Sequence, residues 1–216
     1  MIAASDDHLG RDLGAGIAAP SAQTRTQLRA RLAERATEER LLDVAYATVD
    51  SPLGELVVAT TPSGVVRLAF ANEARDVVLG DLARRVSPRV LEAPARLDTT
   101  RRELDEYFDG HRTRFDLTLD WALTTGFRRE VLAATSRIPY GHTSNYRSVA
   151  TAAGSPRAVR AAGTALATNP IPIVVPCHRV LRSDGTLGGY GGGIERKEEL
   201  LRLEASTRAG GPAANG

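Results

Sequence analysis

The chain has 216 residues, of which 42% are hydrophobic and 25% charged, as in ordinary globular proteins with one large domain or two small ones. Its single cysteine excludes an internal disulfide and a cysteine-rich zinc site, and it is typical of proteins from a reducing cytoplasm. No apolar run is long enough to cross a membrane, and the first residues are acidic where a secretory signal is basic. We therefore expect a cytoplasmic protein without membrane contacts.

Charge is divided unevenly along the chain. Residues 1–120 hold 16 Arg and 20 acidic residues, whereas residues 121–204 hold 10 Arg and one Lys against 6 acidic residues. The second half therefore carries a net charge of +5, which favours a polyanionic partner such as nucleic acid. A solvated basic face without any partner is the alternative.

The first 41 residues predict an extension to the folded protein. Residues 1–22 are rich in Gly, Ala, Ser and Asp and lack periodicity, so we expect them to be disordered. Residues 23–41 predict a helix with a thin apolar stripe that includes Leu28 and Leu32.

Residues 42–120 predict a small α+β domain. Three β-type runs are separated by turn sequences so short that an antiparallel meander is expected: 42–49, 54–60 and 64–70. Two helices and one further strand follow: 73–86, 98–109 and 113–119. Because no motif in this domain indicates chemistry, we assign it the role of a scaffold.

Residues 121–205 predict a mainly helical domain. Its first helix covers 126–137, and Ser144 and Ser155 are the expected N-caps of two short helices over 145–153 and 157–167. Two such helices joined by a turn that contains Gly154 indicate a helix-turn-helix, and the small residues of the second helix allow close approach to a surface. A helix over 195–204 closes the domain, and we expect 206–216 to be a disordered tail.

Cys177, the only cysteine, follows an apolar run and precedes a histidine and an arginine. Nearby cations raise the thiolate fraction of a cysteine, and thiolate is a strong nucleophile, although an inert buried cysteine is the alternative. His178 is the candidate base, and Glu204 on the last helix is the carboxylate that would orient it. Because neighbours on an extended strand point to opposite faces, the pair requires a turn at Pro176–Cys177 or a bridging water.

Two further features surround this pair in the sequence. Asn169, flanked by Pro170 and Pro172, is placed to hold such a turn through side-chain hydrogen bonds. The glycine cluster of residues 187–194 has neither Walker nor Rossmann spacing. It predicts a flexible loop whose backbone N–H groups lie beside Tyr190, which suits a planar ligand, and a plain connector is the alternative.

These motifs together resemble the O6-alkylguanine-DNA alkyltransferases, which repair DNA by moving an alkyl group from guanine to a cysteine. The resemblance rests on Asn169-Pro-x-Pro, Val175-Pro-Cys-His-Arg-Val180, Gly188-x-Tyr-x-Gly-Gly and a closing helix that ends in Glu204. It is dense over 125–204, looser over 42–120 and absent over 1–41. It implies an α+β fold with a small N-terminal antiparallel-sheet domain and a helical DNA-binding domain.

The resemblance also implies a mechanism. Cys177 resembles the thiol that attacks the alkyl carbon by in-line displacement. His178 would be the base, acting through a water and polarised by Glu204, while Asn169 would brace the turn. Tyr146 resembles the residue that helps to flip the nucleotide and protonates the departing guanine. No cofactor or metal is implied, and the protein is consumed because a thioether cannot be reduced back to a thiol.

The remaining site residues implied by the resemblance bind the base or the DNA. Tyr190 and Pro172 would be walls of the guanine pocket, with Gly191 beside them and the backbones of Cys177 and Val180 reading the base edge. Arg160 resembles the residue that enters the duplex in place of the flipped base. Further DNA contacts are expected from three residues: Tyr146, Arg157 and Ser155.

The implied partner is double-stranded DNA that contains O6-alkylguanine, and O4-methylthymine is a second expected substrate. We expect a monomer, with cooperative assembly on DNA left open. Three other classes of protein are weaker interpretations. A non-reactive alkyltransferase-like protein would lack the cysteine, a Cys-His hydrolase would need an oxyanion hole that no motif suggests, and a helix-turn-helix regulator would leave the Cys-His motif without a purpose.

The chain departs from the family pattern at three places. Gly191 stands where many members carry a residue such as Ser, so a hydroxyl that could bond the guanine oxygen is missing. Leu166-Ala-Thr168 replaces residues that are usually small or polar, and Gly126-Phe-Arg128 stands where Pro/Asp-Phe-Gln is common. The single cysteine also excludes the cysteine-ligated zinc domain of the family's multidomain form.

Overall fold

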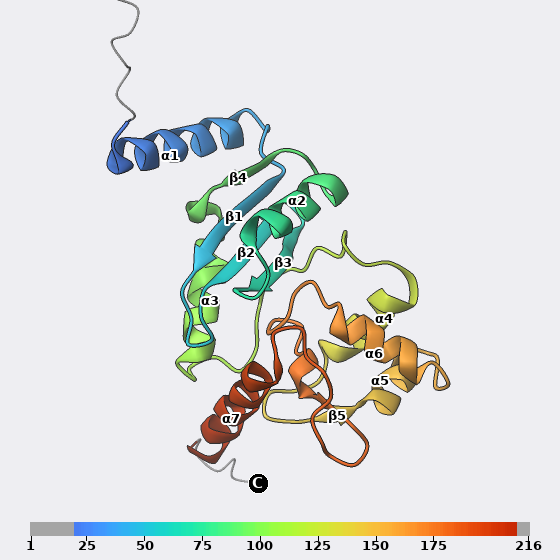
Figure 1. Cartoon of the computed structure of the whole chain (residues 1–216). Helices are drawn as coiled ribbons and strands as arrows, with labels where there is room; N and C mark the ends of the chain where they lie inside the picture. Colours follow the sequence, from blue (N-terminus) through green and yellow to red (C-terminus); the bar gives the residue numbers. More distant parts are fainter. Residues whose placement is uncertain (1–19, 211–216) are drawn as a thin grey trace, which may run out of the picture.

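A computed structural model describes residues 20–210, with side chains through Thr207. The expected disordered stretches therefore lie largely outside the described residues. Figure 1 shows a sheet with flanking helices, a group of helices beside it, and a final helix that packs near both. This arrangement agrees with the predicted α+β class of a small sheet domain followed by a helical domain.

The sheet has four strands in the order β3-β2-β1-β4: β1 (Val44–Val49), β2 (Leu56–Thr61), β3 (Gly64–Phe70) and β4 (Val90–Glu92). The first three form the predicted antiparallel meander. The fourth pairs parallel with β1 and was not predicted, because three half-buried residues give too short a pattern to recognise.

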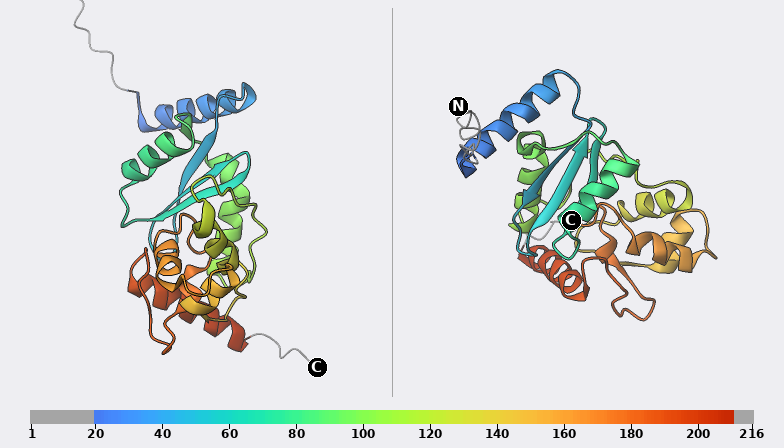
Figure 2. Two further views of the ribbon diagram at one scale, coloured as in Figure 1. Left: turned by 90° about the vertical axis from the view of Figure 1, so that its right-hand side faces the viewer. Right: turned by 45° about the horizontal axis from the view of Figure 1, so that its top comes forward.

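Both faces of the sheet are covered, since α2 (Arg75–Arg85) and α3 (Asp98–Phe108) lie on opposite sides of it (Figure 2). Alternate residues of β2 accordingly belong to two separate hydrophobic clusters, one on each face of the sheet. Val58 packs with Leu104 of α3, whereas Val57 packs with Leu82 of α2. A short 3-10 helix, η1 (Pro94–Leu97), precedes α3 and contributes the buried Leu97.

The predicted strand over 113–119 is wrong as a sheet member. The segment is extended, but it pairs only through an isolated bridge between Val65 and Leu119. The backbone N–H of Asp116 donates to a Glu103 carboxylate oxygen at 2.9 Å instead of to a strand. A side chain of α3 therefore binds a backbone N–H group that would otherwise pair with a neighbouring strand.

The helical part contains α4 (Gly126–Thr135), α5 (Tyr146–Ala152) and α6 (Val159–Ala167), which pack on one another. Both predicted N-caps are wrong. Asn145 caps α5 by accepting from the Ser148 N–H at 2.9 Å, and Ser144 instead lies in a two-residue strand. Ser155 accepts from the Ala158 N–H in a turn, so α6 begins later, without a side-chain cap.

One helix lies near each end of the described residues. The helix α1 (Ala22–Glu38) matches the predicted one, and Ser21 caps it by accepting from the Thr24 N–H at 3.1 Å. The helix α7 (Ile194–Gly210) extends past the predicted end at 204 and includes the first residues of the expected tail. Within residues 20–210, no helix is long and apolar enough to cross a bilayer.

Candidate active site

Cys177 begins a single 3-10 turn, η2 (Cys177–Arg179), directly after Pro176. Its backbone N–H donates to the carbonyl of Val175 at 2.8 Å, so the chain turns at the point where the sequence requires it. The side chain is only 6% exposed. The thiol therefore lies on a tight turn inside the protein, where a nucleophile is shielded but held at a fixed position.

Asn169 holds this turn from the side. Its amide nitrogen donates to the Val175 carbonyl at 2.8 Å and to the Cys177 Sγ at 3.1 Å, while its Oδ1 accepts from the Ile171 N–H at 3.0 Å. Ile173, which lies between Asn169 and Cys177 in the chain, has a φ of 72°. This left-handed conformation costs a β-branched residue about 1–3 kcal/mol. The hydrogen bonds of Asn169 offset part of this strain and tie the turn to the end of α6.

His178 and Glu204 meet in the buried interior. His178 Nε2 lies 2.9 Å from Glu204 Oε1, and both side chains are almost fully buried. A hydrogen bond to a carboxylate places the imidazole proton on Nε2, which leaves Nδ1 as the basic nitrogen. Nδ1 is buried and has no hydrogen-bond partner among the described residues. This nitrogen is therefore available to accept a proton.

Glu204 is fixed by donors from three parts of the chain. Arg179 donates from Nε at 2.9 Å and from Nη2 at 2.8 Å, and the Gly141 N–H donates at 3.1 Å. The Tyr107 hydroxyl donates from α3 at 2.8 Å. Burial raises the pKa of Glu204, but the bonds from His178 and Arg179 overcome it and hold the pKa at about 2. The carboxylate is therefore ionised at any physiological pH.

The thiol itself is not acidic in the resting protein, contrary to the expectation that cations would raise its thiolate fraction. Burial raises the pKa of Cys177 to about 11, against smaller lowering effects from Asn169 and the buried Lys197. The Arg179 guanidinium donates to Glu204, and among the described residues the hydrogen bond to the sulfur comes from Asn169 instead. A base is therefore needed to generate the thiolate at neutral pH.

A cavity of about 440 Å³ opens onto Cys177. Three of the expected base-binding residues line it: Pro172, Tyr190 and Gly191. Phe70 of β3 lines it as well, with its ring centroid 5.8 Å from that of Tyr190 in an edge-on contact. A Cβ on Gly192 would come within 2.7 Å of the Phe70 ring, so only glycine allows the loop to lie this close.

Tyr146 is brought beside the active-site turn by a two-strand sheet. The strands β5 (Ser144–Asn145) and β6 (Val180–Leu181) pair in parallel, so the start of α5 lies next to the residues that follow Cys177. Burial raises the pKa of Tyr146, which keeps its phenol protonated. A Cβ on Gly188 would collide with the Tyr146 hydroxyl oxygen, so this glycine makes room for the ring.

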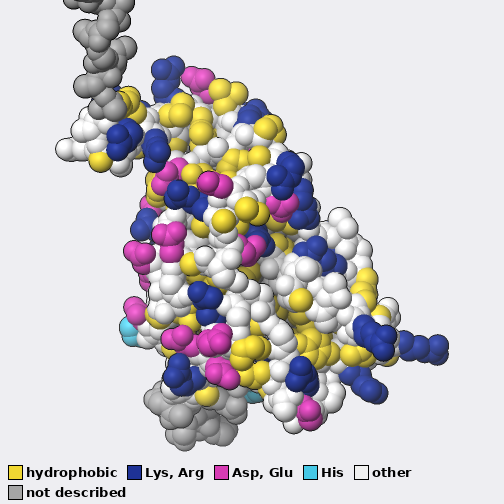
Figure 3. All heavy atoms as spheres, viewed as in Figure 1, with side chains coloured by type: hydrophobic (Ala, Val, Ile, Leu, Met, Phe, Trp, Pro, Cys, Tyr) yellow, Lys and Arg dark blue, Asp and Glu magenta, His cyan; other side chains and the backbone are white. Residues whose placement is uncertain are grey.

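The expected DNA-binding residues lie on and before α6. Arg157 and Arg160 are exposed, and Ser155 is half-buried in the turn that precedes the helix. Figure 3 shows basic side chains projecting from the region of α5 and α6, with few acidic groups near them on this face. A basic, small-residue helix of this kind can approach a polyanion closely.

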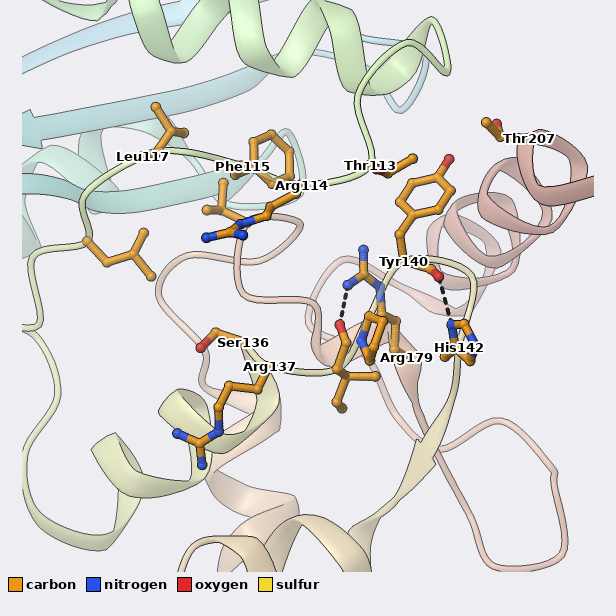
Figure 4. Close-up of a pocket in the computed structure, with 14 residues that line it drawn as sticks. Thr113, Arg114, Phe115, Leu117, Ser136, Arg137, Tyr140, His142, Arg179 and Thr207 are labelled. Carbon is orange, nitrogen blue, oxygen red and sulfur yellow. Dashed lines mark hydrogen bonds between the residues drawn. The ribbon is translucent and has the colours of Figure 1, made fainter. Parts of the chain in front are cut away.

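A second cavity, of about 850 Å³, is bordered by Arg179, the last residue of η2 (Figure 4). Its wall includes Arg179, which donates to the Ile138 carbonyl at 2.6 Å, and Tyr140, whose carbonyl oxygen lies 2.9 Å from His142 Nδ1. No cysteine lines this cavity. Although it is the larger of the two, it does not reach the nucleophile.

Sequence reasoning missed three residues of the site. Tyr107 and Phe70 come from the N-terminal domain, which is therefore more than a scaffold. Lys197 is fully buried, donates to the Val180 carbonyl at 2.7 Å, and stabilises a thiolate electrostatically. Lys197 stands in a run of charged residues that reads as an exposed helix face, so no signal in the sequence indicated its burial.

A buried cysteine on a braced turn, backed by a histidine–carboxylate pair and open to a cavity, defines a protein with a nucleophilic thiol. Models of two domains of 6-O-methylguanine DNA methyltransferases match the chain: the ribonuclease-like domain over residues 44–121 and the DNA-binding domain over residues 126–206. The chain therefore belongs to the O6-methylguanine DNA methyltransferase family.

Relatives with this fold are similar over most of their own length. A methylated-DNA–protein-cysteine methyltransferase of Mycolicibacterium paratuberculosis is 41% identical over 74% of this chain and 92% of its own. The constitutive enzyme of Bacillus subtilis is 40% identical over 74% and 94%. A crystal structure of Mycobacterium tuberculosis OGT with DNA superposes with a TM-score of 0.66, at 38% identity over 78% of this chain and 96% of that one.

Proposed function

We propose that the protein repairs DNA directly, by moving the alkyl group of O6-alkylguanine to the Sγ atom of Cys177. The observation that carries the proposal is the joint placement of this thiol and of His178. Asn169 holds the thiol at the wall of an open cavity. The next residue, His178, has a free Nδ1, and its Nε2 is hydrogen-bonded to the ionised Glu204.

The displacement balances without a cofactor. The Cys177 thiol gives its proton to His178 Nδ1 through a bridging water, and the sulfur then attacks the alkyl carbon. The S–C bond forms as the C–O6 bond breaks, and the electron pair goes to guanine. Tyr146 supplies the proton that the departing guanine needs, and its phenol is recharged from the imidazolium through solvent. The thioether is stable, so each molecule reacts once.

Glu204 makes this proton transfer favourable. Burial lowers the pKa of His178, so the free imidazole is neutral at pH 7 and can accept a proton. Once the imidazole is charged, the adjacent carboxylate stabilises it across the 2.9 Å bond. Arg179 and Tyr107 hold the carboxylate in place, which keeps the imidazole aimed at the thiol.

The substrate base must leave the DNA stack to reach Cys177, because the thiol is buried. Extruding a base costs a few kcal/mol, and a side chain can fill the space that it leaves. We propose Arg160, on the exposed face of α6, for this role, and Arg157 and Ser155 as phosphate contacts. Tyr190 and Pro172 would enclose the flipped guanine, with Gly191 and the Cys177 and Val180 backbones at its edge.

A transfer assay tests the proposal. The protein is incubated with a duplex that carries one O6-methylguanine with a labelled methyl group. We expect the label on the protein to stop at one methyl per molecule, and the variant Cys177→Ser to bind the duplex with unchanged affinity but to take up no label. Label uptake by Cys177→Ser, or continued turnover, would contradict the assignment.

The compartment follows from the same chemistry. A free thiol that reacts only once must not be consumed by oxidation beforehand, and a reducing environment preserves it. We therefore propose that the protein works in the cytoplasm, as a monomer that meets damaged DNA there.

A further inference from the structure

The cavity at Cys177 is larger than a methyl group requires, and it continues toward a group of arginines. Its volume is about 440 Å³, and its wall includes, besides Cys177 and Pro170, three basic residues: Arg67, Arg85 and Arg128. These come from β3, α2 and α4, so both domains contribute to this end of the cavity. Cys177 and these arginines therefore line one and the same cavity.

Two of the three arginines are neutralised by carboxylates. Arg67 forms an ion pair with Glu73, and Arg85 lies 3.0 Å from Asp81, which is also 3.6 Å from Arg84. Both carboxylates line the same cavity. With Arg128 included, the wall carries one more positive charge than negative.

Arg128 supplies the excess charge. It donates to the Thr168 carbonyl at the end of α6, and no carboxylate lies within ion-pair distance of it among the described residues. Its Nε is buried and has no hydrogen-bond partner among those residues. Burial lowers the pKa of this guanidinium, and repulsion from Arg85 and Arg67 lowers it further. A half-buried guanidinium beside two like charges therefore lacks, among the described residues, the anion that would normally accompany it.

We propose, on the basis of the function proposed above, that this cavity accepts O6-alkyl groups that end in a carboxylate, and that Arg128 binds that carboxylate. The transfer step itself is unchanged. The S–C bond forms, the C–O6 bond breaks, and the carboxylate stays on the alkyl chain and keeps its charge. A planar guanidinium with a free Nε–H is suited to hold a carboxylate, and the interaction gains strength from partial burial.

Matched substrates isolate the charge of the alkyl group. The probes are duplexes with O6-carboxymethylguanine or O6-(4-carboxybenzyl)guanine, each compared with the neutral carbamoyl analogue of the same length. The phosphates are identical within each pair, so the ratio of single-turnover rates for acid and amide reports only the contact at the end of the alkyl group. Two lengths are used because the carboxylate must reach the guanidinium.

We expect Arg128→Gln to lower the acid-to-amide ratio by about tenfold for at least one length, the effect of one partly solvated charge-assisted hydrogen bond. Arg128→Lys retains the charge and should retain most of the preference. Arg129→Gln is the matched control, because Arg129 is exposed on the same helix and does not line the cavity. Its ratio should equal that of the unchanged protein.

Two results would overturn the proposal: a ratio that Arg128→Gln leaves unchanged at both lengths, or no transfer of either acidic group. A variant that slows acid and amide equally would assign Arg128 to the DNA backbone instead. Methyl transfer from an O6-methylguanine duplex to the unchanged protein is measured in parallel. Failure of that reaction would refute the proposed function itself, whereas success with a flat ratio would refute only the role of Arg128.

Discussion

Replacement of His178 by Gln should change how the rate of alkyl transfer depends on pH. Glutamine is of similar size and can still donate a hydrogen bond to Glu204, but it cannot accept the proton of Cys177. Without a base, the reaction depends on the thiolate that forms spontaneously. Because the pKa of Cys177 is about 11, on the order of one molecule in a thousand is ionised at pH 8.

The magnitude of the change follows from this pKa. Below pH 10, each unit of pH raises the thiolate fraction about tenfold, so the variant should show a slope near one in a plot of log rate against pH. The unchanged protein should instead give a flat profile above about pH 7. Burial lowers the pKa of His178, so its imidazole is already neutral and ready to accept the proton there.

The assay is a rapid-quench, single-turnover reaction with an O6-methylguanine duplex between pH 6.5 and 9.5. Duplex affinity and the circular dichroism spectrum of the variant serve as controls for binding and folding. Parallel profiles for the two proteins would refute the reasoning, because they would show that His178 does not take the proton. A constant offset of this kind would assign His178 a structural role only.

Further predictions concern the residues around this pair. Tyr107→Phe should slow transfer and lower the free energy of unfolding in urea by about 1–2 kcal/mol, because it removes a buried hydrogen bond to Glu204. The folded pKa of Glu204, about 2, lies below its ordinary 4.5, so its stabilisation is complete above pH 4.5 and declines as the pH falls toward 2. Urea unfolding of the unchanged protein should therefore show about 2 kcal/mol more loss between pH 6 and pH 3 than Glu204→Gln. Gly188→Ala should impair repair by displacing the Tyr146 hydroxyl, whereas Gly189→Ala, with open space at its Cβ, should be tolerated; equal rates would contradict this. Arg160→Ala should slow repair of a duplex much more than reaction with the free alkylguanine base, and an equal loss with both would argue against base replacement.

The active-site turn could be predicted from the sequence because its determinants are local. Pro176 ends the apolar run, and Asn169 reaches only eight residues along the chain to bond the thiol. The partnership of His178 with Glu204 was also predictable, since the closing helix brings one carboxylate back to the turn. In both cases, a few residue types at defined spacing dictated the chemistry.

The contributions of the N-terminal domain could not be predicted in the same way. Tyr107 lies 97 residues from Glu204, and the Asn72 side chain donates to the Gly191 carbonyl at 3.0 Å across 119 residues. Such contacts depend on how two domains pack, which hydrophobic periodicity does not encode. Arg128 had no explanation in the sequence for the same reason: its neighbours Arg67 and Arg85 come from the other domain.

The errors at the helix ends arise from pairing and turn formation that side-chain propensity does not register. Ser144 and Ser155 are both good capping residues, but Ser144 pairs with Val180 in a short sheet, and Pro156 begins a turn instead of a helix. Tertiary pairing determined which of two adjacent polar residues became the cap, so Asn145 took the role expected of Ser144. Propensity alone could not distinguish them.

The intact mass of the protein after reaction with an O6-methylguanine duplex tests the central claim most directly. We predict an increase of about 14 Da, the mass of one CH2 group, on every active molecule, with the added mass on the peptide that contains Cys177. The duplex should carry unmodified guanine in equal amount. An unchanged protein mass beside repaired DNA, or a methyl group on any other residue, would contradict the claim.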